Sequence, residues 1–464
     1  MFTRIVQFFY PDLSREEVKK FGLLSLAFFF TIGAYWMLRL LKDTIFFKVA
    51  FPESLGWVAN QGALYQPWAK TMSVGVVLTL VIVYTKLVDL FRKHTLFYII
   101  CSFFAAIFFS ITALLLAREI WGDAAIGKWP MATLGWVSYF AIESFGSIVV
   151  ALFWSFTASV TETDAAKRGF PFIIAGAQIG AIGGSALNIF AAQLGGIWRL
   201  FLLATTFVVA IMVIIRMFMA TIPADERNRP EDAGSIKKSP GMTEMLAGFK
   251  LLFTRGYMFG ILIVSTFYEI VGTIVDYQMK RQADVYPQFK GEVGFAKFMG
   301  IFGVATNSLA LFMALLGTSY LMKRFGLTFC LLIYPVILGG AMFSLYLFFA
   351  YGNPSKALLL WATFGVMMLA KGLSYAVNNP TKEMMYIPTS KDARFKTKGL
   401  IDMFGSRTAK MGGSQFSNLF KHDLSSLMVY GTLLGLGLVG VWLMFALYVG
   451  RKNKQLIDDG EIVQ

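Results

Sequence analysis

Long uncharged segments are the feature that most constrains how this chain folds. Residues 95–117 contain no charged side chain, and similar apolar runs recur along the sequence. A run of about twenty apolar residues is long enough to cross a bilayer as a helix, and soluble domains do not repeat such runs. The 464 residues are 57% hydrophobic, with a mean hydropathy of +0.63. The sequence therefore predicts an all-α polytopic membrane protein.

The apolar runs are distributed evenly about a polar segment near the middle of the chain. Six runs fall within residues 1–220 and six within residues 251–464. Residues 221–250 are polar and contain three prolines, so we expect a cytoplasmic linker there. Two halves of equal helix number are typical of membrane proteins with an internal repeat. We therefore expect about twelve transmembrane helices in two six-helix bundles, a major-facilitator-like layout.

The chain carries a formal net charge of +15, from 42 Lys and Arg against 27 Asp and Glu. Two explanations apply together: basic loops that stay on the cytoplasmic side, and a basic cavity that attracts an anion. The basic loops all fall on one side if there are twelve spans, so both termini are expected in the cytoplasm. Nucleic-acid binding is disfavoured because the charges are dispersed between apolar spans.

The few cysteines and histidines argue against metal binding and enzymatic chemistry. Cys101 and Cys330 lie within apolar segments, whereas His94 and His422 lie in expected loops. This pattern supplies neither a disulfide framework nor a set of metal ligands. Two histidines in expected loops also make a His-based catalytic triad improbable. We therefore expect no cofactor, no metal and no enzymatic activity.

Charged side chains within the spans are the first functional candidates. Lys42 follows the first apolar run, with Arg39 and Asp43 on the same helical face if the helix continues. Snorkelling of Lys42 to the membrane interface is the alternative. Glu143 lies near the middle of the fourth span, where an unpaired carboxylate costs several kcal/mol. We expect a functional role for Glu143, and a structural ion pair with Lys42 or Lys410 is the alternative.

A basic block interrupts the second half between two apolar runs. It contains Lys382-Glu-Met-Met-Tyr-Ile-Pro388, the stretch from Lys391 to Asp402, and Arg407-Thr-Ala-Lys410-Met-Gly-Gly-Ser414. An ordinary cytoplasmic loop would explain the cations alone. The charges continue into apolar sequence, however, and we expect residues 398–420 to form the eleventh span. Asn378-Asn379-Pro380 is expected to end the tenth.

As a set, the motifs resemble the ATP/ADP antiporter family, the nucleotide transporters of plastids and obligate intracellular bacteria. In the basic block they are Lys382-Glu383-Met384-x-Tyr386-Ile387-Pro388, Lys396-x-Lys398-x-x-x-Asp402 and Lys410-x-Gly412-Gly413-Ser414. In the first half they are Leu41-Lys42-Asp43-Thr44, Glu143-Ser-Phe-Gly146-Ser with Phe153-Trp154, and Thr163-Asp164-x-Ala166-Lys167-Arg168. The matches occur in order along both halves, and together they are specific.

The resemblance implies a role in substrate handling for Lys42, which corresponds to a family lysine. Together with the placement of charge, it predicts a phosphate clamp, a group of cations that binds the phosphates of a nucleotide. Its members are expected to be Lys42, Lys398 and Lys410, with Arg407 as a further member.

Acidic residues are expected to balance this clamp when it is empty. Glu143 is one, and either Asp276 or Glu269 is the second. The family has a glutamate near the place of Asp276, with Glu269 lying two turns earlier here, so the identity of the second acid stays open. Further substrate contacts are expected from polar and aromatic residues of the spans: Asp402, Tyr139, Tyr268, Gln178 and Asn188.

The fifth span carries a packing signal beside its two polar candidates. Gly176, Gly180 and Gly184 are spaced by four residues, a pattern that allows two helices to approach closely. Gln178 and Asn188 lie within the same span and are polar enough to face a cavity.

The resemblance implies exchange of ATP for ADP by alternating access, with phosphate as an additional substrate in some members of the family. The alternative is a proton-coupled importer of nucleotides or of another organic anion, with Glu143 as proton carrier. An enzyme acting on lipid phosphates is disfavoured because no clustered His, Ser or paired Asp motif is present. The absence of a transit peptide favours a bacterial inner membrane, and we expect a monomer.

Overall fold

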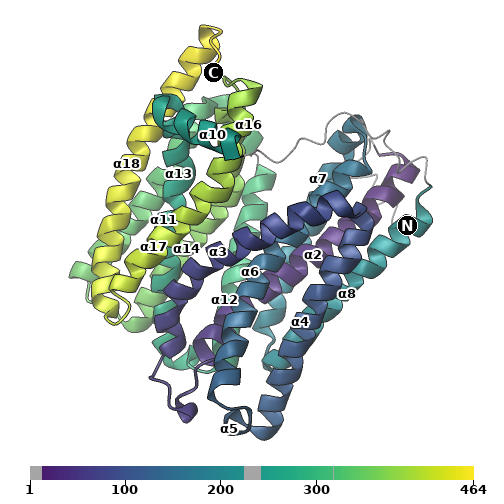
Figure 1. Ribbon diagram of the computed structural model, residues 1–464. Helices are drawn as coiled ribbons and strands as arrows, with labels where there is room; N and C mark the ends of the chain where they lie inside the picture. The colour runs from purple at the N-terminus through teal and green to yellow at the C-terminus, as the bar shows by residue number, and fades with distance from the viewer. Residues whose placement is uncertain (1–12, 224–241, 317, 464) are drawn as a thin grey trace. The chain divides into compact units, whose positions relative to one another are not determined.

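The computed structural model describes residues 13–223, 242–316 and 318–463, and nearly all of them are helical (Figure 1). Eleven helices in these ranges are long and apolar enough to cross a membrane. They are α2 (Arg15–Lys48), α3 (Gln61–Leu90), α4 (Lys93–Trp121), α6 (Lys128–Ser159), α7 (Thr163–Ile189), α8 (Ile197–Thr221), α11 (Gly256–Val285), α12 (Glu292–Leu316), α13 (Thr318–Tyr351), α14 (Lys356–Leu373) and α18 (Leu424–Asp458). The predicted all-α polytopic fold is confirmed.

The chain divides into two compact units. The first comprises Met1–Gly62, Gly75–Lys237 and Gln288–Val304, and the second comprises Ala63–Val74, Lys238–Pro287 and Ala305–Gln464. Two helices are therefore divided between the units. Ala63–Val74 of α3 belongs to the second unit and the rest of α3 to the first, whereas α12 continues from the first unit into the second after Val304. Most of the expected linker, residues 224–241, lies outside the described residues.

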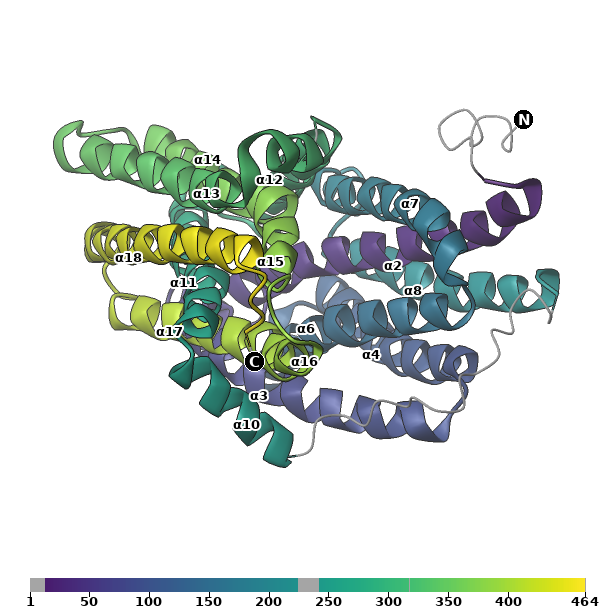
Figure 2. The same cartoon turned by 90° about the horizontal axis from the view of Figure 1, so that it is seen from above.

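In the first unit, α2 is the central helix and packs against α7, α8 and α6 (Figures 1 and 2). Glycines of α7 permit the closest of these approaches. A Cβ atom on Gly184 would lie 2.1 Å from the Gly33 carbonyl oxygen, and one on Gly180 would lie 2.3 Å from that of Phe29. The expected role of the spaced glycines in close helix packing is confirmed.

In the second unit, α11 is central and packs against α18, α14 and α17 (Ser406–Leu419). Buried amides fasten the C-terminal half of α11 to its neighbours. Gln278 donates to the Leu427 carbonyl oxygen at 2.8 Å, and Gln282 donates to the Thr363 hydroxyl at 2.9 Å. These bonds satisfy amide N–H groups that would otherwise be costly away from water, and they tie α11 to α18 and α14.

Two π-helical turns interrupt helices of the second unit. η3 (Ser374–Asn378) leads directly into α15 (Asn379–Met385), so the expectation that Asn378-Asn379-Pro380 ends the helix is wrong. Pro380 lies in the first turn of α15, where its missing N–H costs little. The second turn, η4 (Ile401–Gly405), joins α16 (Lys391–Leu400) to α17. Such turns are frequent at functional sites.

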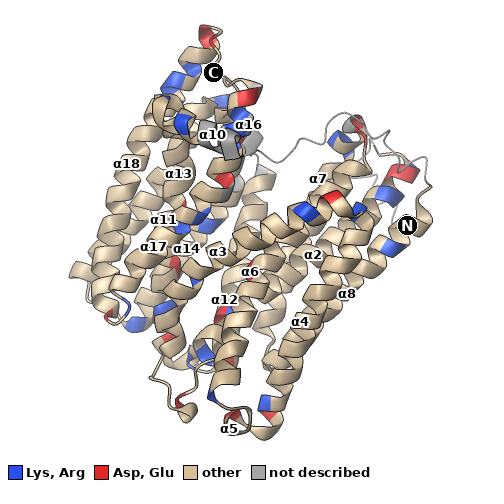
Figure 3. Cartoon of the chain, in the orientation of Figure 1, with Lys and Arg blue, Asp and Glu red and all other residues tan. Residues whose placement is uncertain are grey.

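The expected eleventh span, residues 398–420, is helical, but it is divided among α16, η4 and α17. None of these pieces reaches the length of a candidate span by itself. The shorter elements elsewhere are η1 (Glu53–Leu55), α5 (Asp123–Ile126), α10 (Met242–Thr254) and η2 (Pro287–Phe289). Figure 3 shows many charged residues at helix ends and loops, and a smaller set within helices. Lys42, Glu143, Glu269, Asp276 and Lys410 are charged residues that lie within helices.

Candidate functional site

The first unit brings together Lys42, Glu143 and Tyr139. Lys42 on α2 forms an ion pair with Glu143 on α6, and their side chains are 6% and 33% exposed. The Lys42 ammonium also lies 4.3 Å from the centre of the buried Tyr139 ring, a cation–π contact. Because α2 continues to Lys48, Lys42 lies inside the helix rather than at its end. This geometry disfavours snorkelling as the reason for a lysine here.

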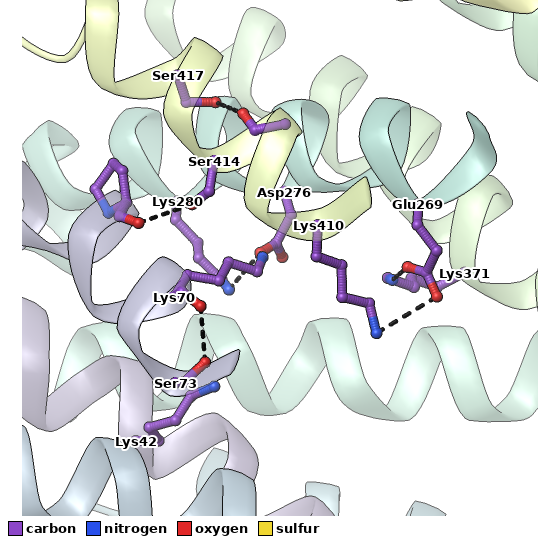
Figure 4. A network of polar contacts seen from close by, with 12 residues as sticks. Lys42, Lys70, Ser73, Glu269, Asp276, Lys280, Lys371, Lys410, Ser414 and Ser417 are labelled. Carbon is purple, nitrogen blue, oxygen red and sulfur yellow. Dashed lines mark hydrogen bonds and ion pairs between the residues drawn. The ribbon is translucent and has the colours of Figure 1, made fainter. Parts of the chain in front are cut away.

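In the second unit, the carboxylate of Asp276 on α11 lies between two ammonium groups. Lys280 is 2.7 Å away and Lys70 is 3.3 Å away (Figure 4). Lys70 belongs to the portion of α3 that packs in this unit. The same portion is held to α17 because the Ser414 hydroxyl donates to the Pro67 carbonyl oxygen at 3.0 Å.

The carboxylate of Glu269, two turns before Asp276 on α11, also contacts two ammonium groups. It lies 3.4 Å from Lys410 on α17 and 3.9 Å from Lys371 on α14 (Figure 4). The Tyr268 hydroxyl donates to it at 2.7 Å. Both acids that were left as alternatives are therefore buried, and each faces two lysines.

Sequence reasoning left four lysines of the second unit out of the site. Lys70, Lys280 and Lys371 contact the two carboxylates of α11. Lys382 lies 4.3 Å from the centre of the Tyr268 ring and donates to the Ser265 carbonyl oxygen at 3.0 Å. Lys371 could have been predicted, because it is a charged residue within an apolar run. Nothing in the sequence around Lys70 indicates that it contacts Asp276.

Other members of the expected clamp lie elsewhere in the second unit. Lys398 on α16 pairs with Glu383, at 2.6 and 2.7 Å to its two oxygens. Lys398 and Lys410 are separated along one helical run by roughly 18 Å of rise. Arg407 is partly buried on α17, and Asp402 is exposed in η4. The structure therefore does not bring Lys398 next to Lys410.

Gln178 and Asn188 lie on α7 of the first unit. Gln178 is partly buried, and Asn188 is fully buried. The Asn188 amide donates to the carbonyl oxygens of Gly184 at 3.2 Å and Met37 at 3.5 Å. These contacts join α7 to α2 through the amide nitrogen, whereas the buried amide oxygen of Asn188 has no hydrogen-bond partner among the described residues.

Comparison with known proteins places these residues in a family. The TLC ATP/ADP transporter family matches residues 1–455. The chain is 28% identical to the chloroplastic ADP,ATP carrier protein 2 of Arabidopsis thaliana, across 97% of this chain and 78% of the relative. It is 26% identical to ADP,ATP carrier protein 1 of Rickettsia conorii, across 88% and 87%, and to that of Chlamydia muridarum, across 89% and 84%.

Solved structures of membrane transporters share the fold. The nucleoside transporter NupG aligns with a TM-score of 0.59 at 15% identity, covering 93% of this chain and 99% of its own. A D-xylose-proton symporter aligns with a TM-score of 0.60 at 14% identity, covering 93% and 96%. The predicted major-facilitator-like architecture is confirmed. Because the family match extends over nearly the whole sequence, this chain is a multi-pass membrane transporter that belongs to the TLC ATP/ADP transporter family.

Proposed function

We propose that this protein exchanges ATP for ADP across a bacterial membrane. The relatives in Arabidopsis, Rickettsia and Chlamydia are named ADP,ATP carriers. The observation that carries the proposal is the pairing of helix lysines with carboxylates in each unit: Lys42 is buried against Glu143, and half-exposed Lys410 lies against buried Glu269. Ammonium groups within membrane spans are costly and usually serve a substrate or an ion.

The carboxylates have a defined role in this exchange. In the empty carrier they neutralise the lysines, and in the loaded carrier the phosphates of the nucleotide take their place. Lys398 and Arg407 supply further positive charge when the Lys398–Glu383 pair opens. The halves 1–220 and 251–464 then rock and expose the site to each side of the membrane in turn. The empty carrier moves slowly, which makes exchange obligatory.

Counter-exchange in proteoliposomes tests the proposal. Vesicles loaded with ADP should take up labelled ATP, and Lys42→Ala or Lys410→Ala should lower the rate at least tenfold. The matched control is Lys454→Ala, which removes an exposed lysine from the end of α18. Full exchange by both site variants would contradict the clamp. Uptake driven by an imposed pH gradient without internal nucleotide would instead support a proton-coupled importer.

A further inference from the structure

Lys382 has an unusual environment for a lysine in a membrane protein. Among the described residues it forms no ion pair with a carboxylate. Its ammonium group contacts one backbone oxygen, that of Ser265, and the face of the Tyr268 ring. A cation–π contact and one carbonyl oxygen compensate only part of the lost hydration of an ammonium group. Three carboxylates act on this ammonium group only from beyond ion-pair distance, those of Glu269, Asp402 and Glu383.

Two other lysines gather with Lys382 around one carboxylate. Glu269 is under the electrostatic influence of Lys371, Lys382 and Lys410 together, and we call these three lysines the Glu269 lysine group. Other carboxylates also act on two of them, so Glu269 balances the group only in part. Lysines gathered in this way within a membrane protein are expected where an anion binds.

The shortest contact of Glu269 is with a neutral group. Lys410 and Lys371 are 3.4 and 3.9 Å from the carboxylate, whereas Lys280 lies at 2.7 Å from Asp276. The shortest hydrogen bond to Glu269 comes instead from the neutral hydroxyl of Tyr268, at 2.7 Å. When an incoming anion draws the ammonium groups away, Glu269 Oε1 keeps the hydrogen bond from Tyr268.

The surrounding structure holds this arrangement in place. Tyr268 packs against Tyr334 and Trp442, with ring centres 6.3 and 6.4 Å away. The Tyr334 hydroxyl donates to the Ala370 carbonyl oxygen at 2.6 Å, next to Lys371 in the chain. Gly272 has no side chain, and a Cβ atom at this position would lie 4.0 Å from the ammonium nitrogen of Lys371. The aromatic residues thus position both Glu269 and the base of Lys371.

We propose that Lys371, Lys382 and Lys410 form one binding subsite for the polyphosphate of the transported nucleotide. Lys382 is its member without a close ion pair among the described residues, and Tyr268 with Glu269 is the group that balances the subsite when it is empty. The inference rests on the proposed function and adds Lys371 and Lys382 to the substrate-binding residues. A purely structural role, in which Lys382 fastens α15 to α11 through Ser265, is the competing explanation.

Two substitutions separate these roles. Lys382→Gln removes the charge but keeps an N–H donor for the Ser265 carbonyl oxygen, whereas Lys382→Met removes both. The matched control is Lys454→Gln, which removes an exposed charge from α18. If Lys382→Gln does not fold, Lys371→Gln removes a charge from the same subsite and takes its place.

The measurement is a thermal-shift titration of the purified full-length protein with ATP, inorganic tripolyphosphate and adenosine. We expect Lys382→Gln to keep the ligand-free melting temperature and to bind ATP and tripolyphosphate about 10- to 100-fold more weakly. Adenosine binding should not change, and Lys454→Gln should behave as wild type. Wild-type affinity of Lys382→Gln for both phosphate ligands would overturn the proposal, as would a lower melting temperature without any change in affinity.

The same titration distinguishes failure of the subsite from failure of the proposed function. Lys382-dependent binding of tripolyphosphate by a protein that does not exchange nucleotides would support the subsite and contradict ATP/ADP exchange. Nucleotide exchange that is unaffected by loss of Lys382 would support the function and contradict the subsite.

Discussion

The ammonium group of Lys70 lies 3.3 Å from the carboxylate of Asp276, although the two residues are 206 positions apart in the chain. Lys280 approaches the same carboxylate to 2.7 Å from one turn further along α11. One buried acid therefore separates two ammonium groups of the second unit. Its removal would leave like charges facing each other away from water, which is strongly destabilising.

Asp276→Asn is therefore expected to destabilise the protein and to abolish exchange. Breaking a buried ion pair typically costs about 3–5 kcal/mol, because the remaining charge loses its partner. Asp276→Glu keeps the charge and should retain much of the transport. Melting temperature and counter-exchange of labelled ATP check both variants. An Asp276→Asn protein with wild-type stability would show that the two lysines are satisfied by other groups.

Lys42 and Glu143 should behave as a coupled pair. Glu143→Gln leaves Lys42 buried without its carboxylate, so both stability and exchange should fall. In the exchanged double variant Lys42→Glu with Glu143→Lys, stability should partly return, with a coupling energy of about 0.5–3 kcal/mol. Transport should stay low, because the cation then extends from α6 and no longer from α2. A double variant that transports normally would argue that the position of this lysine is unimportant.

Asn188→Leu is expected to affect stability rather than substrate affinity. The amide of Asn188 is buried and bonds to two backbone carbonyl oxygens, so its loss should cost about 1–3 kcal/mol. Chemical denaturation and ATP titration of the same preparation measure the two effects separately. A more than tenfold loss of ATP affinity would instead support the substrate contact that the sequence suggested for this residue.

Gly184→Val should prevent α2 and α7 from packing. A Cβ atom on Gly184 would lie 2.1 Å from the Gly33 carbonyl oxygen, which is backbone and cannot move aside cheaply. The matched control is Gly183→Ala, where a Cβ meets no atom within 4 Å. The yield of monodisperse protein in detergent is the measurement. Equal yields of the two variants would mean that the helices can separate without loss of the fold.

Val463→Pro tests the attachment of the C-terminal tail. The Val463 N–H donates to the Pro388 carbonyl oxygen at 2.9 Å, and the Val463 carbonyl oxygen accepts from the Ser390 N–H at 2.9 Å. Proline removes the first of these bonds, for a loss of about 1 kcal/mol. Val463→Ala keeps both and serves as the control. Equal melting temperatures of the two variants would show that the tail contributes nothing to stability.

Much of the fold could be predicted from the sequence because each span is a local property of about twenty residues. The runs near residues 21–41 and 95–117 correspond to α2 and α4. The interval between Asn378 and Pro380 was misjudged because a π turn lets the backbone continue through residues that usually end helices. Whether the helix ends or continues at these residues depends on the backbone geometry, which the sequence does not give.

The residues of the candidate site were predicted less completely than the spans that carry them. Three candidates were chosen for a charge in or beside apolar sequence, where a buried charge is costly: Glu143 inside a run, Lys42 directly after one, and Lys410 where the basic block continues into one. Lys382 was assigned to a basic loop, since nothing in its neighbours in the chain indicates the Tyr268 ring that covers it.

By itself, the sequence determined that this chain crosses a membrane many times as helices and that it carries lysines and acids within those helices. Tertiary structure alone decided which acid each lysine meets. Lys70 meets Asp276, Lys398 meets Glu383, and Lys382 meets an aromatic ring. The physical reason is that hydrophobicity accumulates along a segment, whereas an ion pair depends on a few ångströms between side chains that distant segments bring together.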